Sequence, residues 1–289
     1  MPDKIPSPEG FRAKLRADRA AFAARPITGT RFQVPRDGKD AVEVILYRPS
    51  APHDGLLPVL FNSHGGAWIG GDAVLMDSFC SLLAEEIPAL VVNINYKKAD
   101  VHPFPYAIEE ICDTVQYFAA HATDYGVDPT RFAVGGHSAG AQLSAGAAMK
   151  LKEDGFPLAC QMLVYPCVDM SDKGGLFQLI GPMLFPEGEQ THRWASPLLA
   201  PDEALRGLAP AIFIECGRDD LKPQGIAYAK RLIDVAVPVK VKEYPEALHG
   251  FLEVNRPEYE GDERRSPAQD AMTRDCERYL IRELRANFA

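Results

Sequence analysis

The stretch RFAVGGHSAGAQLSAGAAMKLK, residues 131–152, decides the fold of this 289-residue chain. Its first six residues form a short apolar run that predicts a strand, and the residues from Ser138 onward predict a helix. The junction reads Gly-x-Ser-x-Gly, in which a side chain at Gly136 or Gly140 would collide with neighbouring chain. A serine at such a sharp strand-to-helix turn projects its hydroxyl above a sheet. The pattern is weak alone, but between a strand and a helix it predicts a nucleophilic serine.

Short β-branched runs bounded by Pro, Gly or Asp surround this stretch. They predict strands at residues 42–48, 58–64, 89–96, 131–136, 160–166, 211–216 and 239–244, and helical spacing predicts helices at 105–122, 138–152, 223–236 and 271–286. Strands that alternate with helices and are apolar nearly throughout indicate a parallel sheet covered on both faces. Ligands bind such sheets at the carboxyl ends of the strands, so chemistry should follow directly after strands.

A serine hydroxyl needs a base within hydrogen-bond reach. Among the seven histidines, the best candidate is His249, which lies in EALHGF a few residues after a predicted strand. The imidazole in turn needs an acid that holds one tautomer. Two carboxylates, Asp219 and Asp220, follow another predicted strand, and the residues alone do not separate them. The order Ser, Asp, His along the chain is that of α/β-hydrolases.

A glycine-containing loop, HGGAW at residues 64–68, follows the predicted strand PVLFNS. Small residues let the backbone approach a substrate and aim its N–H groups at a developing oxyanion. The expected donors are the N–H groups of Gly65 and Gly66, together with that of Ala139 beside the serine. His64 is expected to brace this loop through hydrogen bonds without titrating in the mechanism.

Five motifs in this order, HGGAW, NYKKADVHPFPYA, GGHSAGA, GRDDL and HGF, resemble the hormone-sensitive-lipase-like family of bacterial carboxylesterases. The resemblance covers roughly residues 42–255. It implies an α/β-hydrolase fold with about eight mostly parallel strands flanked by helices, a small helical cap, and hydrolysis of short-chain acyl esters without a cofactor. It also assigns the acid to Asp219 rather than Asp220, and the oxyanion glycines to Gly65 and Gly66.

The chain departs from this family at three places. Ala67 stands where a third glycine is usual, His137 stands where an acidic residue is usual, and Lys-Lys-Ala-Asp-Val at residues 97–101 replaces Arg-Leu-Ala-Pro-Glu. The Gly-x-Ser-x-Gly turn at residues 136–140, here called the elbow, and the HGG-x-W loop also resemble those of kynurenine formamidases, which cleave an N-formyl amide with the same triad. Formamidase or amidase action is therefore an alternative, and a non-catalytic receptor of the same fold is a third.

We expect one domain over residues 1–289, with the family's cap supplied by residues 1–30 and about 169–195. In the first segment, Phe11, Leu15 and Phe22 share one face of a predicted helix. The second segment mixes Gly and Pro with several large apolar side chains, including Phe177, which are expected to pack against another apolar surface. The sequence leaves open whether these segments cover a pocket or pack passively on the surface.

The composition is that of an ordinary globular protein with a net charge of -9, from 31 Lys and Arg against 40 Asp and Glu. An acidic surface repels phosphate backbones and anionic headgroups, so neither nucleic acid nor a membrane is an expected partner. The first residues, MPDKIPSPEGFRAKLRADRAAF, contain no apolar leader, and no apolar run reaches about 18 residues. We therefore expect a cytoplasmic protein that acts on a small ester.

The six cysteines lie mostly in apolar stretches and form no Cys-x-x-Cys pair. In a reducing compartment they are expected to be small buried hydrophobic residues rather than disulfides. No Cys and His residues stand at the spacing of a zinc site, so no metal is expected. The last predicted helix offers a face on which a homodimer could form.

Overall fold

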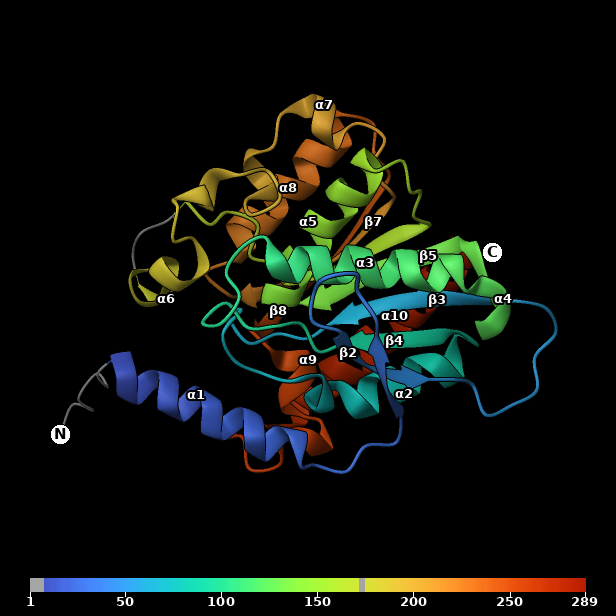
Figure 1. Ribbon diagram of the computed structural model, residues 1–289, viewed down its shortest axis with the longest axis horizontal. Coiled ribbons are helices and arrows are strands. Elements are labelled where there is room, and N and C mark those ends of the chain that lie inside the picture. Colours follow the sequence, from blue (N-terminus) through green and yellow to red (C-terminus); the bar gives the residue numbers. More distant parts are fainter. Residues whose placement is uncertain (1–7, 172–174) are drawn as a thin grey trace.

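An eight-stranded, mostly parallel sheet forms the centre of the molecule (Figure 1). The structure is a computed structural model that describes residues 8–171 and 175–289. The strands are β1 Thr30–Val34, β2 Val42–Tyr47, β3 Leu57–Ser63, β4 Leu90–Ile94, β5 Val127–His137, β6 Cys160–Val164, β7 Ala211–Arg218 and β8 Val239–Leu248, in the spatial order β1-β2-β4-β3-β5-β6-β7-β8. β2 pairs antiparallel with β1 and β4, and the six strands from β4 to β8 are parallel.

The expected α/β-hydrolase fold is confirmed, and each of the seven predicted strands is present. The strand that the sequence analysis missed is β1, whose residues TRFQV are mostly exposed. A short strand at the sheet edge has one neighbour and little apolar surface to bury, so its sequence carries a weak signal.

Helices cover both faces of the sheet. They are α1 Pro8–Ala23, α2 Asp77–Glu86, α3 Tyr106–Ala120, α4 Ala122–Tyr125, α5 Ala139–Glu153, α6 Leu176–Leu184, α7 Asp202–Leu205, α8 Lys222–Asp234, α9 Phe251–Val254 and α10 Pro267–Phe288. Side chains of α3, α5 and α8 share one apolar core with one face of the sheet, and side chains of α2 and α10 share a second core with the other face. Within β3, Val59 and Phe61 belong to the first core and Leu60 to the second, as the two-residue repeat of a strand requires.

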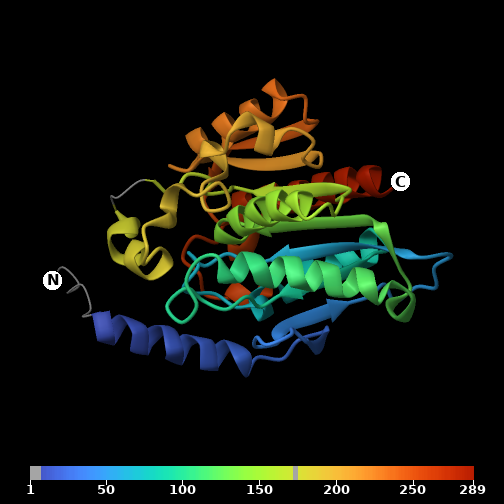
Figure 2. The same cartoon turned by 45° about the horizontal axis from the view of Figure 1, so that its top comes forward.

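The two segments expected to form a cap lie at the end of the sheet where the parallel strands terminate (Figures 1 and 2). From α1, Arg19 donates to the carbonyl of Ile69 and forms an ion pair with Asp100, so the helix is tied to loops that follow β3 and β4. The end of α6 is held by the amide of Phe104, which donates to the carbonyl of Leu184 over 3.0 Å. Residues 1–7 and 172–174 of the expected cap segments, and the side chain of Phe11, lie outside the described part of the structure.

Among the helices of residues 8–171 and 175–289, none is long and apolar enough to cross a bilayer. All six cysteines are buried, as expected of small hydrophobic residues. Burial raises the pKa of several of these thiols, Cys160 among them, so the thiolate form is disfavoured.

Candidate active site

The turn between β5 and α5 holds Ser138 in a strained backbone conformation, with φ of 53° and ψ of -116°. The chain can make this turn because its flanking residues lack side chains. A Cβ at Gly136 would lie 2.6 Å from the carbonyl oxygen of Ser63, and one at Gly140 would lie 2.1 Å from the same atom. Both contacts are with main chain, which cannot move aside. The packing therefore agrees with the sequence argument that glycine is required at both positions.

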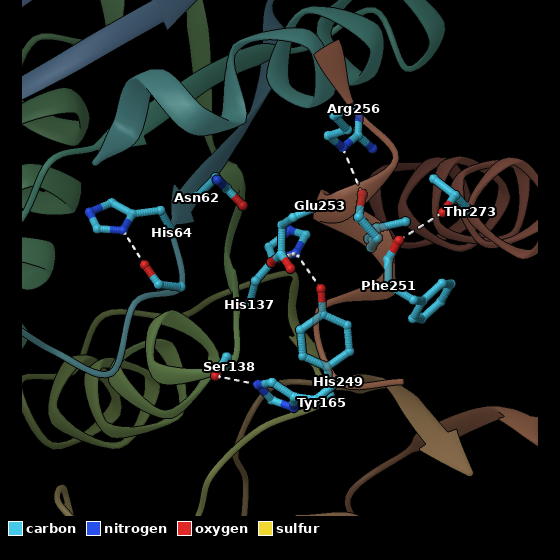
Figure 3. Close-up of polar contacts among 12 residues, drawn as sticks. Asn62, His64, His137, Ser138, Tyr165, His249, Phe251, Glu253, Arg256 and Thr273 are labelled. Carbon is cyan, nitrogen blue, oxygen red and sulfur yellow. Dashed lines mark hydrogen bonds and ion pairs between the residues drawn. The ribbon is translucent and has the colours of Figure 1, made fainter. Parts of the chain in front are cut away.

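Three residues predicted to act together meet above this turn, and Figure 3 shows two of them, Ser138 and His249. His249 Nε2 lies 2.8 Å from Ser138 Oγ, and His249 Nδ1 lies 2.6 Å from Asp219 Oδ2. Asp219 is 5% exposed at its side chain, and its second oxygen accepts from the amide of Leu221 over 2.9 Å. The structure thus brings Ser138, His249 and Asp219 into one hydrogen-bonded chain. It also distinguishes Asp219 from Asp220, because it is Asp219 that contacts the histidine.

The HGGAW loop lies against the serine. A Cβ built on Gly65 would be 3.6 Å from the Cβ of Ser138, so the loop backbone approaches the nucleophile closely. Gly66 has a φ of 130° and no room for a side chain, because its Cβ would be 2.3 Å from the carbonyl oxygen of Gly70. Ala139, the third expected donor, is the buried first residue of α5. Ala67, which replaces the family's third glycine, has a φ of 50°, a conformation that costs an alanine about 1 kcal/mol.

His64 contacts both the backbone of its own loop and the neighbouring residue Tyr96. Its Nδ1 lies 2.5 Å from the carbonyl oxygen of Gly65, and its own carbonyl accepts from the hydroxyl of Tyr96 over 3.1 Å. Its ring stacks on that of Tyr96, with centroids 4.4 Å apart. Burial, assisted by the charge of Lys98, lowers the pKa of His64 well below its usual value, so the imidazole is neutral. A neutral ring can donate one hydrogen bond and accept another.

A buried network beneath the serine was not found from the sequence. His137 Nδ1 lies 3.1 Å from Glu253 Oε1 and 3.3 Å from the hydroxyl of Tyr165 (Figure 3). Burial raises the pKa of Glu253, but the hydrogen bond and charge of His137 outweigh this and hold that pKa below its usual value. The ring of Tyr165 also contacts the edge of His249, with centroids 5.0 Å apart. His137, which is unusual in the elbow, was the one sequence feature that pointed to this network. Its partner Glu253 is distant in sequence, so the pairing could not be inferred.

A cavity of about 760 Å³ opens over these residues. Ser138, His249, Gly65, Gly66 and Trp68 are among the residues that line it. The two segments expected to form the cap each contribute an aromatic ring, Phe22 from α1 and Phe177 from α6. The cavity is large enough for a small organic ligand, and apolar side chains line it together with the polar groups of Ser138, His249 and Asp219, as in binding sites for such ligands.

The sequence and the fold are similar to those of known hydrolases. A family model described as the alpha/beta hydrolase fold matches residues 60–253. LipN, a carboxylic ester hydrolase of Mycobacterium tuberculosis, is 33% identical over 228 residues, which are 71% of this chain and 60% of LipN. Esterase LipI of the same organism is 32% identical over 224 residues, covering 72% of this chain and 70% of LipI. This chain therefore spans only 60% of the length of LipN.

The crystal structure of a thermostable esterase from Pseudomonas putida is similar to the whole fold, with a TM-score of 0.81 and 26% sequence identity, covering 98% of this chain and 91% of that one. Sheet order, motif order and sequence similarity point to the same group of proteins. The chain belongs to the α/β-hydrolase-fold family and, within it, to the hormone-sensitive-lipase-like carboxylesterases.

Proposed function

We propose that this protein is a serine carboxylesterase that cleaves short-chain acyl esters through an acyl-enzyme, with Ser138, His249 and Asp219 as its triad. The observation that carries the proposal is the unbroken path from Asp219 Oδ2 through both ring nitrogens of His249 to Ser138 Oγ. A base that is oriented by an acid and lies within reach of a hydroxyl is the arrangement that activates a serine.

In the first half of the reaction, Ser138 Oγ attacks the ester carbonyl carbon while His249 Nε2 takes the hydroxyl proton. Asp219 accepts a hydrogen bond from His249 Nδ1–H, which keeps the imidazole in the tautomer with Nε2 free and stabilises the imidazolium that forms. His249 then returns the proton to the departing alkoxide, and the acyl group stays on Ser138. In the second half, water attacks the acyl-enzyme in the same way and releases the acid.

Negative charge develops on the former carbonyl oxygen during both attacks. The proposed donors to this oxygen are the backbone N–H groups of Gly65 and Gly66, from the HGGAW loop, and of Ala139, the first residue of α5. Such fixed donors need no rearrangement when the charge appears, and removing one typically costs about 10²–10³ in rate. His64 supports the loop and is not given a proton-transfer role.

The preference for a small acyl group is supported by the walls of the cavity. The ring centroids of Trp68 and Phe177 lie 6.0 Å apart, and Trp68 is held by a 2.7 Å hydrogen bond from its Nε1 to Gln142 Oε1. A rigid aromatic wall close to the serine leaves room for a short chain and opposes a long one.

The test is the initial rate of hydrolysis of p-nitrophenyl esters from acetate to dodecanoate, with Ser138→Ala measured alongside. We expect the rate to peak at short chains and kcat to fall by at least about 10⁴-fold in the variant. Ser144→Ala is the matched control, because Ser144 is a buried serine of the same helix. Near-full activity of Ser138→Ala would refute the assignment of the nucleophile, and a peak at long chains would refute the proposed acyl group.

The formamidase alternative finds no support among the relatives named above, which are esterases, and the presence of all three triad residues argues against the receptor alternative. The cytoplasmic location and the homodimer through the last helix stay predictions. So does the role of α1 and α6 as a cap.

A further inference from the structure

A lysine is buried directly behind the HGGAW loop. Lys98 is 6% exposed, and its ammonium group lies 4.2 Å from the centre of the Tyr96 ring. Its Nζ lies 2.9 Å from His64 Nε2, 3.1 Å from Asn95 Oδ1 and 2.7 Å from the carbonyl oxygen of Tyr96. Nothing in the proposed mechanism uses this residue, although a buried charge is costly unless it is well paired.

Two of the three partners of Lys98 can only accept. The carbonyl oxygen of Tyr96 has no proton, and the amide of Asn95 is oriented by its Nδ2, which donates to Asp72 Oδ2 over 3.1 Å and to Glu43 Oε1 over 3.3 Å. Its Oδ1 therefore faces Lys98 as an acceptor. An ammonium group has three protons and no lone pair, so the third partner, His64 Nε2, must accept as well.

This assignment determines the tautomer of His64. Since Nε2 accepts from Lys98 and the ring is neutral, the ring proton is on Nδ1. Nδ1–H then donates to the carbonyl oxygen of Gly65, the 2.5 Å contact drawn as a dashed line in Figure 3. In the other tautomer, two lone pairs would face each other across this short distance, and the carbonyl would lose its donor.

The carbonyl of Gly65 belongs to the same peptide unit as the N–H of Gly66. That peptide bond is trans, so its C=O and N–H point in opposite directions. A hydrogen bond that holds the carbonyl toward His64 consequently holds the N–H away from it. In this way one proton on His64 controls the direction of a proposed oxyanion donor.

We propose that Lys98 is a positioning residue for the oxyanion loop, acting by holding His64 in the tautomer that anchors Gly65. The inference rests on the proposed function, since the loop matters for rate only if it binds an oxyanion. Lys98 contacts His64, Asn95 and Tyr96 rather than the nucleophile, so removing it should disturb the transition state more than the binding of the ester.

The first test is a cycle of Lys98→Met, His64→Ala and the double variant, assayed on p-nitrophenyl butyrate. We expect Lys98→Met to lower kcat by about 10- to 100-fold, less than or similar to the loss of an oxyanion donor, with KM changed by less than about twofold. Because Lys98 acts through His64, the double variant should be no slower than His64→Ala. A rise in KM with kcat unchanged, or losses that multiply in the double variant, would overturn the proposal.

The neighbouring lysine provides a matched control. Lys97 is partly buried, and its Nζ donates to the carbonyl of Ala41 over 3.2 Å, away from His64. Lys97→Met should leave kcat within about twofold of the unaltered protein, which shows that loss of a lysine charge in this segment is not itself the cause. Circular dichroism and urea unfolding establish that each variant is folded before rates are compared.

The second test needs no turnover. Burial lowers the pKa of Lys98 to about 7, assisted by the charge of Arg19 and opposed by the charges of Asp72, Glu110 and Glu43. At pH 6 the ammonium form is therefore populated, and the ¹⁵N shifts of labelled histidine should show His64 protonated at Nδ1. An Nε2–H tautomer would refute the inference even if Lys98→Met fails to fold. If instead Ser138→Ala retained activity, the proposed function would fail while the tautomer assignment stood.

Discussion

Replacing Glu253 by glutamine tests the buried network beneath the nucleophile. The change keeps the size of the side chain and removes its charge, leaving His137 without its carboxylate partner at 3.1 Å. Both side chains are buried, at 0% exposed for His137 and 9% for Glu253. Water therefore cannot replace the hydrogen bond that His137 loses in the variant.

The expected loss follows from that burial. Breaking a buried pair by altering one partner typically lowers the free energy of unfolding by about 3–5 kcal/mol. For a 289-residue chain the unfolding entropy is about 0.6 kcal/mol per kelvin, so the midpoint of thermal unfolding should fall by about 5–8 °C. An exposed pair gives a contrast, since Lys230 and Asp234 are 72% and 57% exposed at their side chains. Such pairs contribute about 0–1 kcal/mol.

The assay is urea unfolding of the unaltered protein, Glu253→Gln and the control Asp234→Asn, followed by tryptophan fluorescence at pH 7. A loss for Glu253→Gln no larger than that of the control would refute the reasoning. It would mean that the 3.1 Å contact between His137 and Glu253 contributes no more to the free energy of unfolding than an exposed ion pair does.

The same experiment has a pH dependence of known sign. Because the pKa of Glu253 is lower in the folded protein than in the unfolded chain, its contribution to stability is present above about pH 4.3 and is lost as the pH falls through the folded-state pKa. The difference between the unaltered protein and Glu253→Gln should therefore shrink as the pH falls below about 4. A difference that grows in acid would contradict the assignment.

Two further predictions concern packing and the cavity. Gly140→Ala should abolish folding or activity, because its Cβ would lie 2.1 Å from the Ser63 carbonyl oxygen. Gly181→Ala in α6 should instead raise the free energy of unfolding by up to about 1 kcal/mol, because its Cβ would meet nothing within 4 Å. Thermal unfolding of both variants checks this, and equal losses of stability would contradict it. Phe177→Ala should raise the ratio of octanoate to butyrate hydrolysis several-fold, since Phe177 lines both the active-site cavity and a second one of about 560 Å³. An unchanged ratio would show that this ring does not limit the acyl chain.

Much of the fold was predictable because its signals are local. The alternation of apolar strands and amphipathic helices identified seven of the eight strands and the type of sheet. The elbow was also predictable, since the requirement for glycine beside Ser138 arises within a few residues. Each of these signals depends on neighbours in sequence, which the chain order preserves.

The partners within the site depended on the tertiary structure. Asp219 and Asp220 are adjacent and chemically identical, and only the path of the loop carrying His249 decides which of them it meets. Lys98 and His64 are 34 residues apart, and no spacing rule connects a buried ammonium to an imidazole across two loops.

By itself, then, the sequence determined the sheet, the nucleophile and the set of residues that would gather at one end of the strands. Only the tertiary structure decided which of those residues form hydrogen bonds with one another, that His137 contacts Glu253, and which aromatic rings line the cavity. The physical reason is that strands and helices follow from periodic patterns within short windows. Hydrogen bonds between distant loops instead depend on positions within a few tenths of an ångström, which result from the packing of the whole molecule.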